Sequence, residues 1–112
     1  MRIQFFIGVA SALALSACTS VQDVKQRTPD FTSASSKKPS VVGGCVAQRW
    51  RASDLDFKYT PIGDGIEIAV GDPGYYFAVF EAVPVEKGSN VAFYSRSWFG
   101  NEKMLSGVKA CI

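Results

Sequence analysis

Residues 75–83 read Tyr-Tyr-Phe-Ala-Val-Phe-Glu-Ala-Val, which is the strongest strand signal in the chain. The run is rich in aromatic and β-branched residues, which favour strands. It carries apolar side chains at odd and even positions alike: Tyr75, Phe77 and Val79 on one side, and Tyr76, Ala78 and Phe80 on the other. A short run that is apolar on both sides is typical of a buried strand. The sequence therefore predicts a central strand here.

Further strand signals lie on both sides of this run, separated by residues typical of tight turns. Gly71-Asp72-Pro73-Gly74 suits a type II turn, because its second glycine tolerates a positive φ. Pro61 cannot donate a backbone hydrogen bond, so the strand that contains it belongs at a sheet edge. Regular spacing and short turns predict a four-stranded antiparallel meander. The predicted strands are residues 57–62, 66–70, 75–83 and 91–98.

One helix is predicted before the meander in the sequence and one after it. Residues 45–51 place Val46 and Trp50 four positions apart, on one helical face. Near the other end, Asn101 is suited to cap a helix whose apolar residues recur every three or four positions. These apolar residues are Met104, Leu105, Val108 and Cys111. The predicted fold class is α+β, with a short N-terminal helix, the meander and a C-terminal helix.

Residues 1–17 have the layout of a secretory signal peptide. Arg2 is the basic start, residues 5–15 are an apolar run, and Ser16 and Ala17 are small. As a helix the run would cover roughly 16 Å, whereas the hydrocarbon core of a bilayer is about 30 Å thick. The run is therefore too short for a permanent membrane span, and we expect residues 1–17 to be removed.

The sequence Leu15-Ser16-Ala17-Cys18 resembles the lipobox of bacterial lipoproteins. The resemblance implies cleavage before Cys18 and acylation of that cysteine, which would anchor the protein to a membrane through its N-terminal lipid. Thr19 stands where the family's inner-membrane retention signal typically has Asp, which implies the outer membrane of the cell envelope. The alternative is an ordinary secretory signal with an incidental cysteine. The remaining domain has Cys45 shortly before Trp50 and a second cysteine at position 111, and in this it resembles small uncharacterised proteobacterial lipoproteins, a likeness that implies no activity.

Cys45 and Cys111 remain as an even pair in an oxidising compartment, which favours a disulfide between them. The bond would close a loop of 67 residues and link the two predicted helices. The chain-entropy model gives such a loop a stabilisation of about 4 kcal/mol. A redox-active pair is the alternative, but it would be expected at a close spacing such as Cys-x-x-Cys.

Residues 18–40 are predicted to be the lipidated cysteine and a flexible tether, and residues 41–112 the folded domain. Residues 19–40 are rich in Ser, Thr, Lys, Gln and Pro and contain few large apolar side chains. A coil of this length would average roughly 25 Å from end to end. We therefore expect the domain to stand clear of the lipid headgroups.

Composition argues against several classes of function. Residues 41–112 carry seven basic and eight acidic residues, so the domain lacks the basic face that a nucleic-acid partner requires. The chain has no histidine, which removes the commonest general base and metal ligand. Four aspartates raise the question of a calcium site or a glycosidase pair, but their spacing matches neither. These are Asp54, Asp56, Asp64 and Asp72. We expect no catalytic residues, no cofactor and no metal.

Two classes of function remain. The favoured one is a non-catalytic lipoprotein of the cell envelope that binds a protein or an envelope component, and the alternative is a small hydrolase of cell-wall or envelope material that uses carboxylates. Two helices linked by a disulfide can cover only one face of the sheet, so the other face should either bind a partner or be covered by loops or the tether. The candidate residues for this interaction face are Tyr75, Tyr76, Phe77, Phe80 and Tyr94.

Overall fold

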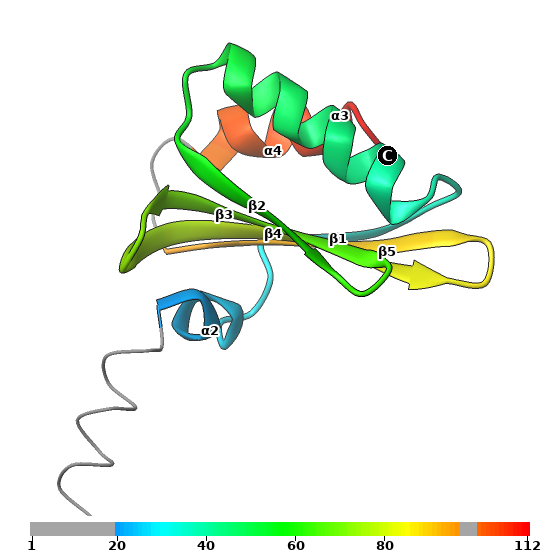
Figure 1. Cartoon of the computed structure of the whole chain (residues 1–112), viewed down its shortest axis with the longest axis horizontal. Helices are drawn as coiled ribbons and strands as arrows, with labels where there is room; N and C mark the ends of the chain where they lie inside the picture. The colour runs from blue at the N-terminus through cyan, green and yellow to red at the C-terminus, as the bar shows by residue number, and fades with distance from the viewer. Residues whose placement is uncertain (1–19, 97–100) are drawn as a thin grey trace, which may run out of the picture.

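The structure is a computed structural model that describes residues 20–96 and 101–112. Its elements are α2 (Ser20–Lys25), β1 (Phe31–Ser35), α3 (Pro39–Ala52), β2 (Phe57–Ile62), β3 (Gly65–Asp72), β4 (Tyr75–Val85), β5 (Gly88–Ser95) and α4 (Asn101–Lys109). The strands form one antiparallel sheet in the order β1-β5-β4-β3-β2. Figure 1 shows α3 and α4 on one face of the sheet and α2 on the other.

The predicted α+β class and the antiparallel meander are confirmed, but the sheet has five strands instead of four. Strands β2 to β5 are the predicted meander, with β4 in the centre and β2 at an edge. Pro61 is compatible with this edge position, because it cannot donate to a strand on both sides. The last predicted strand extends to residue 98, and its final residues 97 and 98 lie outside the described part of the chain.

The fifth strand, β1, corrects the predicted tether. Residues 31–35 pair with β5 along their whole length, from Phe31 opposite Phe93 to Ser35 opposite Ser89. Without β1, the backbone groups on that side of β5 would have no strand partner. The backbone hydrogen bonds gained by pairing with β5 outweigh the weak strand preference of Phe-Thr-Ser-Ala-Ser. The described part of residues 18–40 is therefore structured, and the domain begins well before residue 41.

Helix α3 is longer than the predicted helix over residues 45–51. It begins at Pro39, whose fixed φ suits the first position of a helix, and Lys38 before it is extended. The helix passes through Gly43, where a Cβ atom would lie only 2.8 Å from Ile66 Cγ2. The missing side chain therefore lets α3 pack closely against β3.

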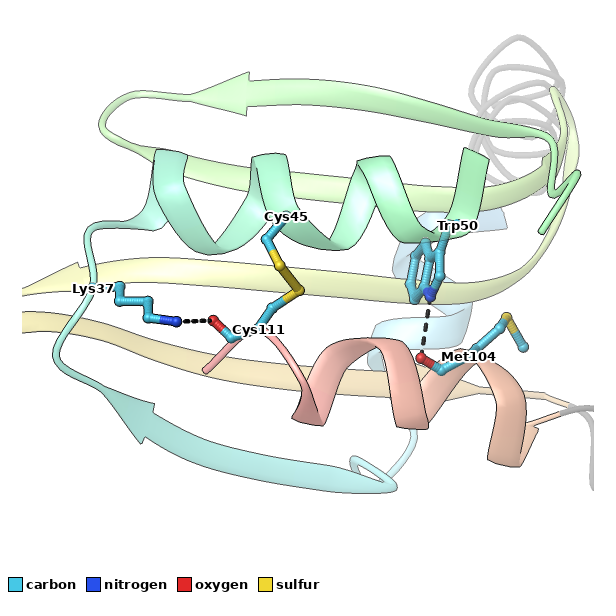
Figure 2. The surroundings of a disulfide bond; sticks show 5 residues. All are labelled: Lys37, Cys45, Trp50, Met104 and Cys111. Atoms are coloured by element: carbon cyan, nitrogen blue, oxygen red, sulfur yellow. Dashed lines mark hydrogen bonds between the residues drawn. A yellow bond between two sulfur atoms is a disulfide. The ribbon is translucent and has the colours of Figure 1, made fainter. Parts of the chain in front are cut away.

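The predicted disulfide between Cys45 and Cys111 is confirmed, and it joins α3 to the residues after α4. The two Cα atoms lie 5.8 Å apart. Figure 2 shows a second link at the other end of α4, where Trp50 Nε1 donates a hydrogen bond to the Met104 carbonyl at 3.1 Å. Lys37 Nζ donates to the Cys111 carbonyl at 3.2 Å. The two helices are therefore joined at two separate points along their length.

The main core lies between these helices and the sheet. Trp50 is at its centre and meets Phe57, Phe80 and Phe93 edge-on, with ring centroids 6.1–6.5 Å apart. Such edge-to-face pairs add stabilisation beyond the burial of their area. Phe80 and Phe93 are therefore part of the interior, where they are completely buried under the helices.

Candidate interaction surface

The five aromatic residues predicted to form an interaction face do not share one face. Phe80 is fully buried in the main core, and Phe77 packs against the same core. Tyr76 is buried on the opposite side of the sheet, in a cluster with Val24 of α2. Phe80 and Tyr76 are therefore unavailable to an interaction face, because the structure buries them in packing, and Phe77 is partly buried against the main core.

A β-bulge explains why the predicted alternation fails at the start of β4. Gly71 pairs with Tyr76, whereas its neighbour Val70 pairs with Ala78, so Phe77 is an extra residue in β4. A bulge of this kind shifts the alternation of side chains by one position. As a result Tyr76 lies on the same side as Val79, although simple alternation places them on opposite sides.

The remaining two aromatics, Tyr75 and Tyr94, are less buried than Phe80 and Tyr76. Tyr75 is 67% exposed, and the Arg96 guanidinium lies over its ring at 5.8 Å from the centroid. Tyr94 is half-buried against the α2 cluster, and its hydroxyl donates a hydrogen bond to Glu81 Oε1 at 3.2 Å. Neither ring forms a stacking platform with the others.

Helix α2 covers one half of the second sheet face. Its Val24 is fully buried and packs in a cluster with Ala69, Tyr76 and Val79. A helix of six residues is too short to be stable alone, so this packing is what supports it. The part of the chain predicted to be a tether thus covers apolar surface that the two larger helices cannot reach.

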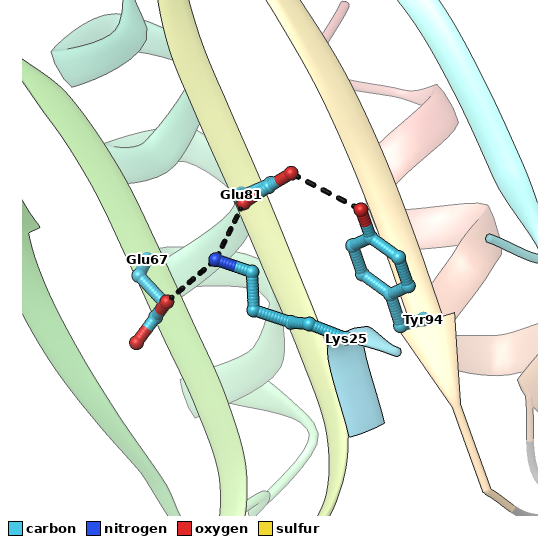
Figure 3. A network of polar contacts seen from close by, with 4 residues as sticks. All are labelled: Lys25, Glu67, Glu81 and Tyr94. Carbon is cyan, nitrogen blue, oxygen red and sulfur yellow. Dashed lines mark hydrogen bonds and ion pairs between the residues drawn. The ribbon is translucent and has the colours of Figure 1, made fainter. Parts of the chain in front are cut away.

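A charged network fixes the end of α2 to the sheet (Figure 3). Lys25 Nζ lies 3.2 Å from Glu67 Oε2 and 2.9 Å from Glu81 Oε2. The two glutamates are directly opposite each other on β3 and β4, an arrangement of like charges that is unfavourable by itself. The ammonium group between them converts this repulsion into an attachment point for α2.

The network also changes the proton affinity of its members. Burial acts to lower the pKa of Lys25, but the hydrogen bonds and charges of Glu81 and Glu67 outweigh burial and raise this pKa above its ordinary 10.5. The pKa of Tyr94 is raised above its ordinary 10.0, mainly by burial and then by the negative charge and hydrogen bond of Glu81. Both groups therefore keep their protons more firmly than they would in an unfolded chain.

Beyond this network the second sheet face is uncovered by any described element. Ile62, Val83 and Val85 lie there, 56%, 48% and 42% exposed. Strand alternation and pairing place all three on the α2 side, towards the β4–β5 hairpin. Beside them lies a groove of about 460 Å³ lined by Thr32, Ser33, Ala34, Glu81, Val83, Asn90, Val91 and Ala92. We call the three aliphatic residues and this groove the open half-face.

Sequence reasoning predicted neither the cover by α2 nor the open half-face. The open half-face consists of aliphatic residues near the turns, whereas the predicted interaction face was based on the aromatic residues of the strands. Asn90 and Ala34 meet across β5 and β1, and this pairing depends on a strand that was not predicted. A signal was present for Ile62 and Val85, since apolar residues next to Gly63 and Glu86 stand close to turns and have little room to be buried.

The structure does not gather the aspartates considered above into a metal site. Within residues 20–96 and 101–112, no three His, Cys, Asp or Glu side chains are grouped so that they could hold a metal ion. The carboxylates of Glu67 and Glu81 do converge, but Lys25 contacts both of them. This pair is thus engaged in holding α2.

A comparison with protein-family models, curated proteins and solved structures finds no match for this chain. No helix in the described part of the chain is long and apolar enough to cross a membrane. Cys18, the predicted lipidation site, lies outside the described residues, as does the predicted signal peptide.

Proposed function

We propose that this chain is a lipoprotein of the bacterial cell envelope, anchored through Cys18, with a non-catalytic domain that binds a protein or an envelope component. The anchor is supported by Leu15-Ser16-Ala17-Cys18 at the end of the apolar run over residues 5–15. Thr19 after the cysteine favours the outer membrane. The disulfide between Cys45 and Cys111 supports an oxidising compartment outside the cytosol.

The binding role is carried by one observation, which is the open half-face. Exposed aliphatic side chains that gather on one surface mark interaction sites more often than scattered ones do. Ile62, Val83 and Val85 gather beside a groove, although α2 covers the neighbouring half of the same face. The catalytic alternative would rest on Glu67 and Glu81, which are held by Lys25.

Metabolic labelling with a fatty-acid analogue tests the anchor. The wild-type chain should incorporate the label, and Cys18→Ser should abolish both the label and cleavage before residue 18. Release of a processed Cys18→Ser protein into the periplasm would show that the signal is of the ordinary secretory type.

Site-specific photo-crosslinking in the native envelope tests the binding role. A photoreactive residue at Val83 should give a discrete adduct, whereas the same residue at Val41 should not. Val41 is a matched control, because it is also a valine, is 53% exposed, and lies on α3. Equal labelling from both positions, or from neither, would contradict binding through the open half-face.

A further inference from the structure

The proposed anchor is separated from the folded domain by a single residue. Thr19 stands between Cys18 and Ser20, and α2 begins at Ser20. Two residue steps span at most about 7 Å, even when fully extended. If Cys18 carries the lipid, as the proposed function holds, α2 lies within this distance of the bilayer surface. The 25 Å spacing expected from a flexible tether is therefore excluded by the position of α2.

Helix α2 in turn fixes which side of the sheet is near the lipid. Val24 is buried on the second face, and Lys25 is paired with carboxylates on β3 and β4. The anchored end of the chain is thus attached to the face that carries the open half-face, while α3 and α4 lie on the other side of the sheet (Figure 1). The anchor and the exposed aliphatic residues consequently face the same way.

We propose that the partner of the open half-face is the bilayer surface itself, with Ile62, Val83 and Val85 lying among the lipid headgroups. Helix α2 projects from the sheet by about 10 Å, one helix diameter. From Val79 beneath α2 to Val85, the strand β4 runs about 20 Å, so an inclined sheet brings both α2 and the hairpin end to one plane.

Because the link between Cys18 and α2 is short, weak contacts are enough to hold the open half-face against the bilayer. A surface held within a few ångströms of its target binds it at a high effective concentration, so three aliphatic side chains need not anchor the protein alone. Lys58 adds a cation on the same side, since it pairs with Ala69 of the α2 cluster and is exposed. Its ammonium group suits the phosphates of the headgroups.

Amine footprinting of the acylated protein tests this orientation. The acylated protein is placed in vesicles of phosphatidylcholine and phosphatidylglycerol, whose headgroups carry no primary amine, and is treated with a membrane-impermeant amine reagent. Labelling of Lys58 is measured relative to Lys103, an exposed residue of α4 on the opposite side. This ratio should be several-fold lower than in an unacylated, soluble reference protein that lacks residues 1–17 and carries Cys18→Ser.

A pair of valine variants then identifies the contact surface. Val83→Asp should restore the labelling of Lys58, and Val41→Asp on α3 should leave the protection intact. Both valines are about half exposed, so both variants should fold, which circular dichroism checks. Equal effects of the two substitutions would overturn the proposed contact.

The remaining outcomes separate this inference from the function on which it rests. An unmodified Cys18 in the intact mass would refute the lipid anchor itself. An acylated protein whose Lys58 is labelled as fast in vesicles as in solution would refute the contact while leaving the anchor in place. Protection in native envelopes but not in protein-free vesicles would show that a protein covers the face, and would overturn the assignment to lipid.

Discussion

Reduction of the disulfide between Cys45 and Cys111 should remove a large share of the stability of this domain. The bonded cysteines are 66 positions apart. For a loop of this size the chain-entropy model gives about 4.4 kcal/mol at 25 °C. A domain of fewer than a hundred residues has a free energy of unfolding of roughly 5–13 kcal/mol, so the bond accounts for a third or more of it.

Urea titration of residues 18–112 carrying Cys18→Ser, monitored by far-UV circular dichroism, measures this contribution. The midpoint should fall by about 2–4 M when a phosphine reductant is present, given a urea dependence of 1–2 kcal/mol per M. Reduction is preferable to Cys111→Ser, because Cys111 is fully buried and its replacement adds a separate burial cost. A loss below about 1 kcal/mol would refute the reasoning, because it would mean that the reduced, unfolded chain gains little freedom.

Three further predictions concern the contacts around the sheet. The pKa values of Lys25 and Tyr94 are raised on folding, so the stability that these groups contribute is complete below about pH 10 and is lost as the pH rises through their folded pKa values. Thermal unfolding between about pH 9 and 11.5 should show this loss of stability, and Tyr94→Phe should make the loss smaller. Gly43→Ala should destabilise by about 1 kcal/mol, because its methyl group meets an isoleucine of β3, whereas Gly44→Ala has open space and should stabilise by up to about 1 kcal/mol; stabilisation by both in urea titrations would contradict the close packing of α3. Trp50→Phe removes the hydrogen bond to the Met104 carbonyl and shortens a core side chain, so it should cost about 1–3 kcal/mol in the same assay. An unchanged midpoint would show that this hydrogen bond is dispensable.

The elements that sequence reasoning predicted are those whose signal is local. The nine residues from Tyr75 carry a continuous apolar pattern, and Pro61 marks an edge wherever the strand is placed. The C-terminal helix has its N-terminal and C-terminal charges and its apolar spacing within a few turns. The disulfide was predicted from the two cysteines that remain once Cys18 is assigned to the lipid, and from the expected compartment.

The missed elements exist only through contacts with distant parts of the chain. Phe31 to Ser35 become a strand because β5 offers an unpaired edge, and Ser20 to Lys25 become a helix because Val24 and Lys25 meet the sheet. Neither segment has enough local preference to be recognised. The bulge at Phe77 was not predicted either, and it altered the candidate site, because one extra residue changed the side of the sheet that Tyr76 faces.

The placement of β1 has a consequence for the order in which the chain folds. Strands β2 to β5 join neighbours through short hairpins, which close within microseconds. Strand β1 instead pairs Phe31 with Phe93, and Cys45 bonds with Cys111, so both closures wait for residues near the C-terminus. Long-range closures of this kind slow folding. A chain that emerges N-terminus first therefore keeps β1 without its partner strand until Phe93 has appeared, and Cys45 without its disulfide partner until Cys111 has appeared.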